Sequence, residues 1–135
     1  MVRIAALICL LSGLVLAACS TKPEPPVNPN IFPTDYKREI LETMRTSLTV
    51  NTNVRDAFIS APVLAQVGTS QRYTACVRSN SRDINGLYTG DKDRIAYFYG
   101  GHLNQLVLAT EGQCTSAAYV PFPELEHLCE AKECK

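Results

Sequence analysis

The sequence predicts an α+β fold, in which an N-terminal helix packs on an antiparallel sheet of three to five strands and a short C-terminal helix follows. Three observations predict it. Apolar residues recur at helical spacing after residue 34, and later segments alternate between apolar and polar residues. Gly100-Gly101 lies between two such segments, as is typical of a tight hairpin.

The length and charge of the chain limit what it can be. At 135 residues there is room for one small domain. The 13 basic residues are balanced by 13 acidic ones, so no overall field directs the chain to nucleic acid. We therefore exclude nucleic-acid binding. We also expect no bound cofactor.

Residues 1–18 have the pattern of an export signal. Met1 and Arg3 supply a positive start, and the stretch from Ile4 to Leu16 is apolar apart from a serine and a glycine. A transmembrane helix needs about 20 apolar residues, and this run is shorter. The pattern favours a cleaved signal peptide.

This signal ends in Leu16-Ala17-Ala18-Cys19, which resembles the lipobox of bacterial lipoproteins. In that family a diacylglyceryl group is attached to the cysteine sulfur, the signal is removed before the cysteine, and the new amino group is usually acylated too. The resemblance implies that Cys19 carries the anchor in a lipid bilayer. Two or three acyl chains hold stably, at roughly 0.8 kcal/mol per buried methylene.

The residue after the cysteine bears on which membrane holds the lipoprotein. In Gram-negative lipoproteins an Asp at this place usually implies retention at the inner membrane, and here the residue is Ser20. The resemblance therefore implies a lipid anchor in the outer membrane, facing the periplasm, if the source is Gram-negative.

Residues 19–33 predict a tether. Five of the eight prolines of the chain lie between Thr21 and Pro33, and proline at that density favours extended, solvated chain. At about 3.1 Å per residue the tether would hold the domain some 40 Å from the bilayer. It is either a functional spacer or an ordinary disordered leader. Residues 34–135 are predicted to form the single α+β domain.

The first element of that domain is a helix. Thr34 or Asp35 is predicted to cap it, and it runs to about Leu48. Arg38 and Glu42 are predicted to form an exposed pair of small value. The apolar stripe consists of Tyr36, Ile40, Leu41, Met44 and Leu48.

Strands are predicted next. Residues 54–60 form a short one, which Pro62 limits to an edge or a bend. Residues 72–79 alternate as a strand does, and residues 80–92 consist of turn residues throughout. A short helix is predicted for Glu124 to Ala131.

The hairpin comprises residues 94–99 and 102–109. A two-residue turn at Gly100-Gly101 places Tyr99 opposite His102 and Tyr97 opposite Asn104. Tyr97, Tyr99, His102 and Asn104 then share one face, which has the composition of a partner-binding surface. The alternative is that these tyrosines are ordinary cover for a helix.

The chain also shows a looser resemblance. Its Asp56-Ala57-Phe58, Cys76-Val77-Arg78-Ser79-Asn80 and Gly86-Leu87-Tyr88-Thr89-Gly90 segments are similar to small bacterial envelope domains with a D-x-A-x-F element and a later C-x-x-x-N…G-x-Y-x-G run. Pro121-Phe122-Pro123-Glu124-Leu125-Glu126 also resembles the close of short alphaproteobacterial lipoproteins. Val77 departs from the glycine of the envelope-domain pattern, which puts a tight turn or close packing there in doubt. The likeness implies fold and location and no activity.

Four cysteines remain after signal cleavage and lipidation, and they allow three pairings. We favour Cys76 with Cys114 and Cys129 with Cys134, as structural disulfides of an oxidising compartment. A metal site at His127, Cys129 and Cys134, with or without His102, stays open but lacks paired C-x-x-C spacing. No metal site is therefore expected, and the spacing argues equally against a redox pair.

Catalytic patterns are weak. No serine lies in a G-x-S-x-G setting, and Asp91 with Asp93 is more often a plain turn than an acid–base or cation site. We expect a non-enzymatic lipoprotein that holds or assembles another envelope protein. The alternatives are a small periplasmic binding or inhibitor module and, third, an enzyme.

Overall fold

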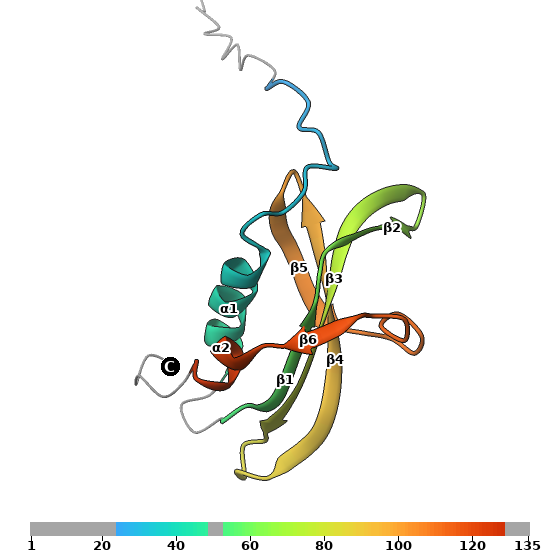
Figure 1. Cartoon of the computed structure of the whole chain (residues 1–135). Coiled ribbons are helices and arrows are strands. Elements are labelled where there is room, and N and C mark those ends of the chain that lie inside the picture. Colours follow the sequence, from blue (N-terminus) through green and yellow to red (C-terminus); the bar gives the residue numbers. More distant parts are fainter. Residues whose placement is uncertain (1–23, 49–52, 129–135) are drawn as a thin grey trace, which may run out of the picture.

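The computed structural model describes residues 24–48 and 53–128. These residues form a six-stranded antiparallel sheet with two helices on one of its faces (Figure 1). The sheet order is β5-β4-β3-β1-β6, and β2 pairs with β3. The elements are α1 (Tyr36–Ser47), β1 (Arg55–Ser60), β2 (Val63–Val67), β3 (Ser70–Arg82), β4 (Tyr88–Tyr99), β5 (His102–Leu108), β6 (Tyr119–Pro121) and α2 (Pro123–Glu126).

The prediction of an α+β fold with three to five strands is wrong. The described part of the chain is mainly antiparallel sheet, with the 12-residue α1 as its one long helix and a four-residue α2. The sequence analysis missed β2 and β6, which have five and three residues. Both are too short to show a clear alternation, and β6 pairs with β1, which lies far from it in the sequence.

The 13-residue β3 organises the sheet. Along one edge it pairs with β4, and along the other it pairs first with β2 and then with β1. Pro62 is buried and lies between β1 and β2, so the short strand that the sequence predicted ends before this proline. β6 continues the sheet beyond β1 only.

The β3–β4 hairpin is longer than the sequence predicted. Residues 80–92 were expected to be turn throughout, but β3 runs to Arg82 and β4 begins at Tyr88. Asp83 makes this tight connection, because its Oδ1 accepts from the N–H groups of Asn85 (2.9 Å) and Leu87 (3.0 Å). Polar residues that were predicted to form a loop therefore lie on strands, where Thr89, Asp91 and Lys92 are exposed and Asn80 is buried.

The β4–β5 hairpin contains a bulge that shifts its register. Tyr99 pairs with His102 as predicted, but Tyr97 pairs with Gln105 and the extra residue is Asn104. From Gln105 onward, each β5 side chain therefore lies on the face of the sheet opposite to the one that the predicted pairing gives it. Leu106 packs on the helix-covered core, and Val107 lies on the opposite face. The predicted pairing of Tyr97 with Asn104 would place these two side chains the other way round.

Helix α1 lies where the sequence predicted it. Asp35 is its first flanking residue, but the carboxylate makes no cap hydrogen bond and instead contacts Arg38 at 2.8 Å. The predicted Arg38–Glu42 pair is present at 3.2 Å. Glu39 accepts from the Leu103 N–H and lies 2.9 Å from Nδ1 of His102, which fixes the helix to the edge of β5.

The two faces of the sheet are covered differently. The face beneath α1 and α2, called the inner face, holds the main core. The other, called the outer face, has a smaller cluster around Cys76, Ile95 and Cys114. The main core consists of Ile40, Met44, Leu48, Val54, Ala57, Ile59, Ala75, Val77, Ala96, Phe98, Phe122, Leu125 and Leu128.

Candidate functional site

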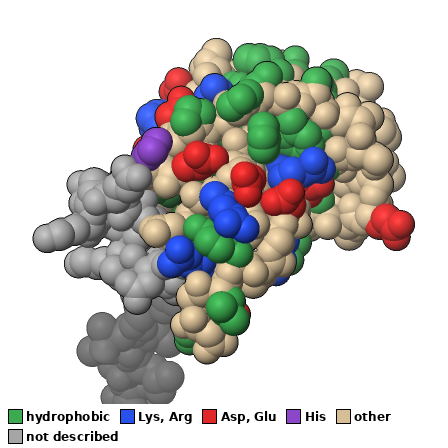
Figure 2. All heavy atoms as spheres, turned by 60° about the horizontal axis from the view of Figure 1, so that its bottom comes forward, with side chains coloured by type: hydrophobic (Ala, Val, Ile, Leu, Met, Phe, Trp, Pro, Cys, Tyr) green, Lys and Arg blue, Asp and Glu red, His purple; other side chains and the backbone are tan. Residues whose placement is uncertain are grey.

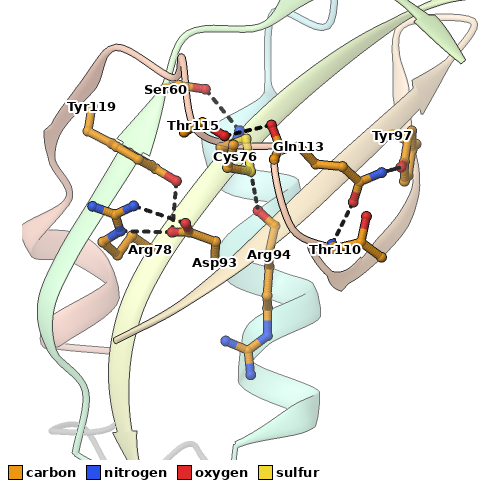
Figure 3. Close-up of a disulfide and its surroundings, with 12 residues drawn as sticks. Ser60, Cys76, Arg78, Asp93, Arg94, Tyr97, Thr110, Gln113, Thr115 and Tyr119 are labelled. Atoms are coloured by element: carbon orange, nitrogen blue, oxygen red, sulfur yellow. Dashed lines mark hydrogen bonds and ion pairs between the residues drawn. A yellow bond between two sulfur atoms is a disulfide. The ribbon is translucent and has the colours of Figure 1, made fainter. Parts of the chain in front are cut away.

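The outer face is covered by a loop and not by a helix. Residues 109–118, called the stapled loop, connect β5 to β6, and Cys114 joins them to β3 through a disulfide with Cys76 (Figure 3). The two Cα atoms are 5.9 Å apart. The predicted Cys76–Cys114 pairing is thereby confirmed, and Cys129 and Cys134 lie outside the described residues.

Two hollows lie between the stapled loop and β2. Their volumes are about 260 and 300 Å³, and they share Ala65, Thr74 and Gln113, so they form one groove. The first is lined by Ser60, Ala61, Val63, Ala65, Thr74, Ala75, Cys76, Gln113, Ser116, Ala117 and Ala118. The second adds Gln66, Val67, Gly68, Ile95 and Tyr97.

The groove is held in shape by two neutral polar groups. Gln113 accepts from the Thr110 N–H at 2.8 Å and donates to the Tyr97 hydroxyl at 3.0 Å, which fixes the loop above β4 (Figure 3). Ser60 Oγ accepts from the Cys76 N–H at 2.9 Å. These hydrogen bonds connect the loop to β4 and β1 to β3, and every side chain that lines the groove is either apolar or polar without charge.

An ion pair lies on the same face, beyond the disulfide. Arg78 binds both carboxylate oxygens of Asp93, at 2.8 and 2.9 Å. The Tyr119 hydroxyl donates to Asp93 at 2.8 Å, and the guanidinium lies 4.5 Å from the Tyr119 ring centroid. A third hollow, of about 300 Å³, opens between this cluster and the stapled loop.

Their surroundings shift the pKa values of Arg78, Asp93 and Tyr119. Hydrogen bonds to Arg78 lower the pKa of Asp93 despite its partial burial, and the same hydrogen bonds raise the pKa of Arg78. Burial first, and the hydrogen bond to Asp93 second, raise the pKa of Tyr119 to about 12. At neutral pH the cluster is thus a closed ion pair with a protonated tyrosine.

Of the four residues predicted to form a partner-binding face, Tyr99 and His102 pair as predicted, but Asn104 does not lie opposite Tyr97. Tyr97 lies on the outer face and is bonded to Gln113, while His102 contacts Glu39 of α1. Tyr99 is exposed, with the Arg72 guanidinium 5.6 Å from its ring centroid, and Asn104 is the bulged residue. The bulge therefore removes Asn104 from the predicted group, and partner binding by the other three residues stays a prediction.

The other candidates for chemistry are also placed. Asp91 and Asp93 lie on β4 and not in a turn, and Asp93 is bound to Arg78. Within residues 24–48 and 53–128, no cluster of three His, Cys, Asp or Glu residues has the geometry of a metal site. His127 is described, but the cysteines of its predicted ligand set are not.

Nothing in the local sequence pattern predicts the groove. Its walls come from β2 and from the stapled loop, which are about 50 residues apart in the chain. A signal was available, since Cys114 stands between the hairpin and Pro121 and was already predicted to pair with Cys76. That pairing requires residues 109–118 to cross the outer face.

Comparison of the chain with protein-family models, with curated proteins and with solved structures finds no match. Among the helices of the described residues, none is long and apolar enough to cross a membrane. The function must therefore be argued from the groove, the disulfide and the sequence.

Proposed function

We propose that this protein is a bacterial envelope lipoprotein, anchored through acylated Cys19, whose domain binds another envelope protein and catalyses no reaction. The apolar run from Ile4 to Leu16 and the lipobox-like segment before Cys19 support the anchor. The Cys76–Cys114 disulfide suits an oxidising compartment. In a Gram-negative cell, Ser20 supports the outer membrane, with the domain in the periplasm.

The observation that carries the binding role is the groove beside an uncovered strand edge. β1 and β2 follow one another along β3, and β6 covers β1 up to Tyr119. Among the described residues β2 pairs with β3 alone. Where β6 ends at Tyr119, no strand takes its place beside β2, so the second edge of β2 is unpaired in this part of the chain. An extended segment of a partner would lie beside β2, next to the end of β6, and pair with the free edge of β2.

The lining indicates what such a segment looks like. Val63 is 59% exposed at the mouth of the groove, and alanines form much of the walls. An alternating segment with small apolar side chains on one face would fill the groove, while its backbone pairs with β2. Charged side chains would be expelled, because the lining offers them no counter-ion.

Anchoring is tested by substituting the proposed lipidated residue. Cys19→Ser should abolish incorporation of labelled fatty acid and release the protein from the membrane fraction. Cys9→Ser, in the signal itself, is the matched control and should leave both unchanged. A wild-type chain that keeps residues 1–18, or that begins at Cys19 with a bare thiol, would refute the anchor.

Binding is tested by a photo-crosslinking residue at Val63 in intact cells. We expect one envelope protein to be captured, and Ala65→Arg, which fills the groove, should reduce the capture at least tenfold. Leu64→Arg is the matched control because Leu64 pairs with Tyr73 and points to the opposite face of β2. Equal loss in both variants, or none in Ala65→Arg, would exclude the groove.

The identity of the captured protein separates the two binding roles. Capture of an envelope scaffold or assembly protein supports the proposal. Capture of a hydrolase whose activity falls when the complex forms would favour the inhibitor module instead.

A further inference from the structure

The end of the predicted tether lies against the domain. The Gly100 N–H donates to the Pro29 carbonyl at 3.2 Å, and the edge of the Phe32 ring contacts Tyr73 with 5.3 Å between centroids. Pro33 is fully buried. Residues 27–33, called the strap, are therefore packed at the end of the sheet that carries the β4–β5 turn, called the hairpin end (Figure 1).

The two glycines of the hairpin turn provide the space for the strap. A β-carbon at Gly100 would lie 2.7 Å from Cγ1 of Val27, and one at Gly101 would lie 3.0 Å from Cγ2 of Ile31. Both glycines also have positive φ angles, of 60° and 85°. The turn that closes the hairpin thus also admits the strap.

This packing shortens the chain that is free to span the distance to a membrane. Only seven residues, 20–26, separate Cys19 from Val27, and the eight steps between the two reach about 25 Å in extended conformation. The strap also fixes the point at which the tether leaves the domain. A lipid anchor on Cys19 would therefore hold the hairpin end, and no other end, close to the bilayer.

The composition of the hairpin end suits a membrane interface. Val27, Ile31, Phe32 and Tyr99 are exposed there to about half of their surface, between 42 and 54%. Arg72 lies over the Tyr99 ring, so its apolar stem and its charge are presented together. Aromatic and aliphatic side chains beside an arginine are typical of the headgroup region of a bilayer.

We propose that the hairpin end rests on the lipid headgroups and that the opposite end, with the Asp83–Leu87 turn, points away from the membrane. This rests on the proposed acylation of Cys19. The 12 residues of β4 at about 3.3 Å each separate the two ends by about 40 Å. The far end mixes acidic, basic and hydrophobic side chains (Figure 2), and its turn exposes Ile84 and Leu87.

The orientation is measured by energy transfer in vesicles. The full acylated protein, with Cys129→Ser and Cys134→Ser, is reconstituted in phosphatidylethanolamine and phosphatidylglycerol that contain a headgroup-linked acceptor dye. A donor dye is placed at Ser70→Cys, the first residue of β3 at the hairpin end, or at Asn85→Cys at the far end. Both residues are exposed, so they form a matched pair.

We expect transfer from position 70 to exceed transfer from position 85 at least threefold. Ile31→Ser together with Phe32→Ser, which loosens the strap, should reduce this contrast. Equal transfer from the two positions in the protein with an intact strap would overturn the orientation.

Failure of the orientation is distinguished from failure of the anchor by two further measurements. The mass of the N-terminal peptide of the native protein reports acylation of Cys19, and a bare thiol would refute the proposed function. A chain with a histidine tag in place of residues 1–19, bound to nickel-chelating lipid, tests the strap alone. Loss of the contrast between positions 70 and 85 there would refute the orientation even if the native anchor is acylated.

Discussion

Arg78, Asp93 and Tyr119 join three strands of the outer face through side chains alone. The sequence predicts a turn at Asp93 because Gly90 and Asp91 precede it, and nothing in the local sequence indicates that β4 has already begun at Tyr88. Its partners lie 15 and 26 residues away in the sequence. By contrast, the Cys76–Cys114 pair was predicted correctly, because few cysteines leave few pairings.

Asp93→Asn should lower the free energy of unfolding by about 1–2 kcal/mol at pH 7, since it leaves a half-exposed Arg78 without its charged partner. The pKa of Asp93 is lowered in the folded protein, so this stability is present above the ordinary value of about 3.9. It is lost as the pH falls through the lower folded pKa. Urea unfolding of the wild type and the variant should therefore converge at acid pH.

The exposed Asp91→Asn is the control for this prediction, and it should change stability little. A constant difference between Asp93→Asn and the wild type from pH 7 down to pH 2 would show that the carboxylate charge is not the cause.

Tyr119 makes a prediction at alkaline pH. Its pKa is raised to about 12 in the folded protein, compared with about 10 for an unfolded chain. A raised pKa contributes stability below the unfolded value, and this contribution is lost as the pH rises through the folded one. Spectrophotometric titration should show one late tyrosine near pH 12, absent in Tyr119→Phe. Titration of all tyrosines together near pH 10 would contradict it.

At the scale of elements, the hairpin shows how far sequence patterns reach. Gly100-Gly101 correctly predicted the turn and the pairing of Tyr99 with His102. It did not show that β4 begins at Tyr88, six residues before the predicted strand. The bulge at Asn104 could not be predicted, because either register buries an apolar residue, Leu106 in one and Val107 in the other. The helix beside β5 decides between them, and it needs Leu106 on the inner face.

Helix α1 depends on Glu39 for its attachment to β5. Glu39→Ala removes the acceptor of the Leu103 N–H and should lower the free energy of unfolding by about 1–3 kcal/mol. Glu42→Ala, on the exposed side of α1, loses only its contact with Arg38 and should cost well under 1 kcal/mol. Thermal unfolding measures both, and equal effects would mean that the contact with β5 contributes nothing.

The stapled loop takes its position from the disulfide. Cys76→Ala together with Cys114→Ala opens a 38-residue loop, for which chain entropy predicts a loss of about 4 kcal/mol. Cys129→Ser together with Cys134→Ser is the control for removal of cysteines in general. Because Gln113 belongs to the loop, crosslinking from Val63 should also fall in the Cys76, Cys114 variant. A stable variant with full crosslinking would refute the role of the disulfide in shaping the groove.

At the scale of the molecule, one long helix was correctly predicted, but it covers one face of the sheet only. The outer face is covered by residues 109–118, which have no periodic pattern, and this is why an α+β arrangement seemed sufficient. The groove arises because a loop, and not a helix, covers the outer face. A loop tied at one cysteine covers Ile95 but leaves β2 uncovered, and no local pattern encodes that difference.

The strap makes the last prediction. A chain that begins at Thr34 loses the Phe32–Tyr73 ring contact, the buried Pro33 and the partner of the Gly100 N–H. An aromatic pair contributes about 1 kcal/mol beyond its burial and a hydrogen bond about 1 kcal/mol. Unfolding in urea should therefore show a loss of about 2–3 kcal/mol relative to a chain that begins at Glu24, since both chains lack the signal and Cys19. Equal stability would mean that the strap only rests on the hairpin end and cannot fix how the domain stands on a membrane.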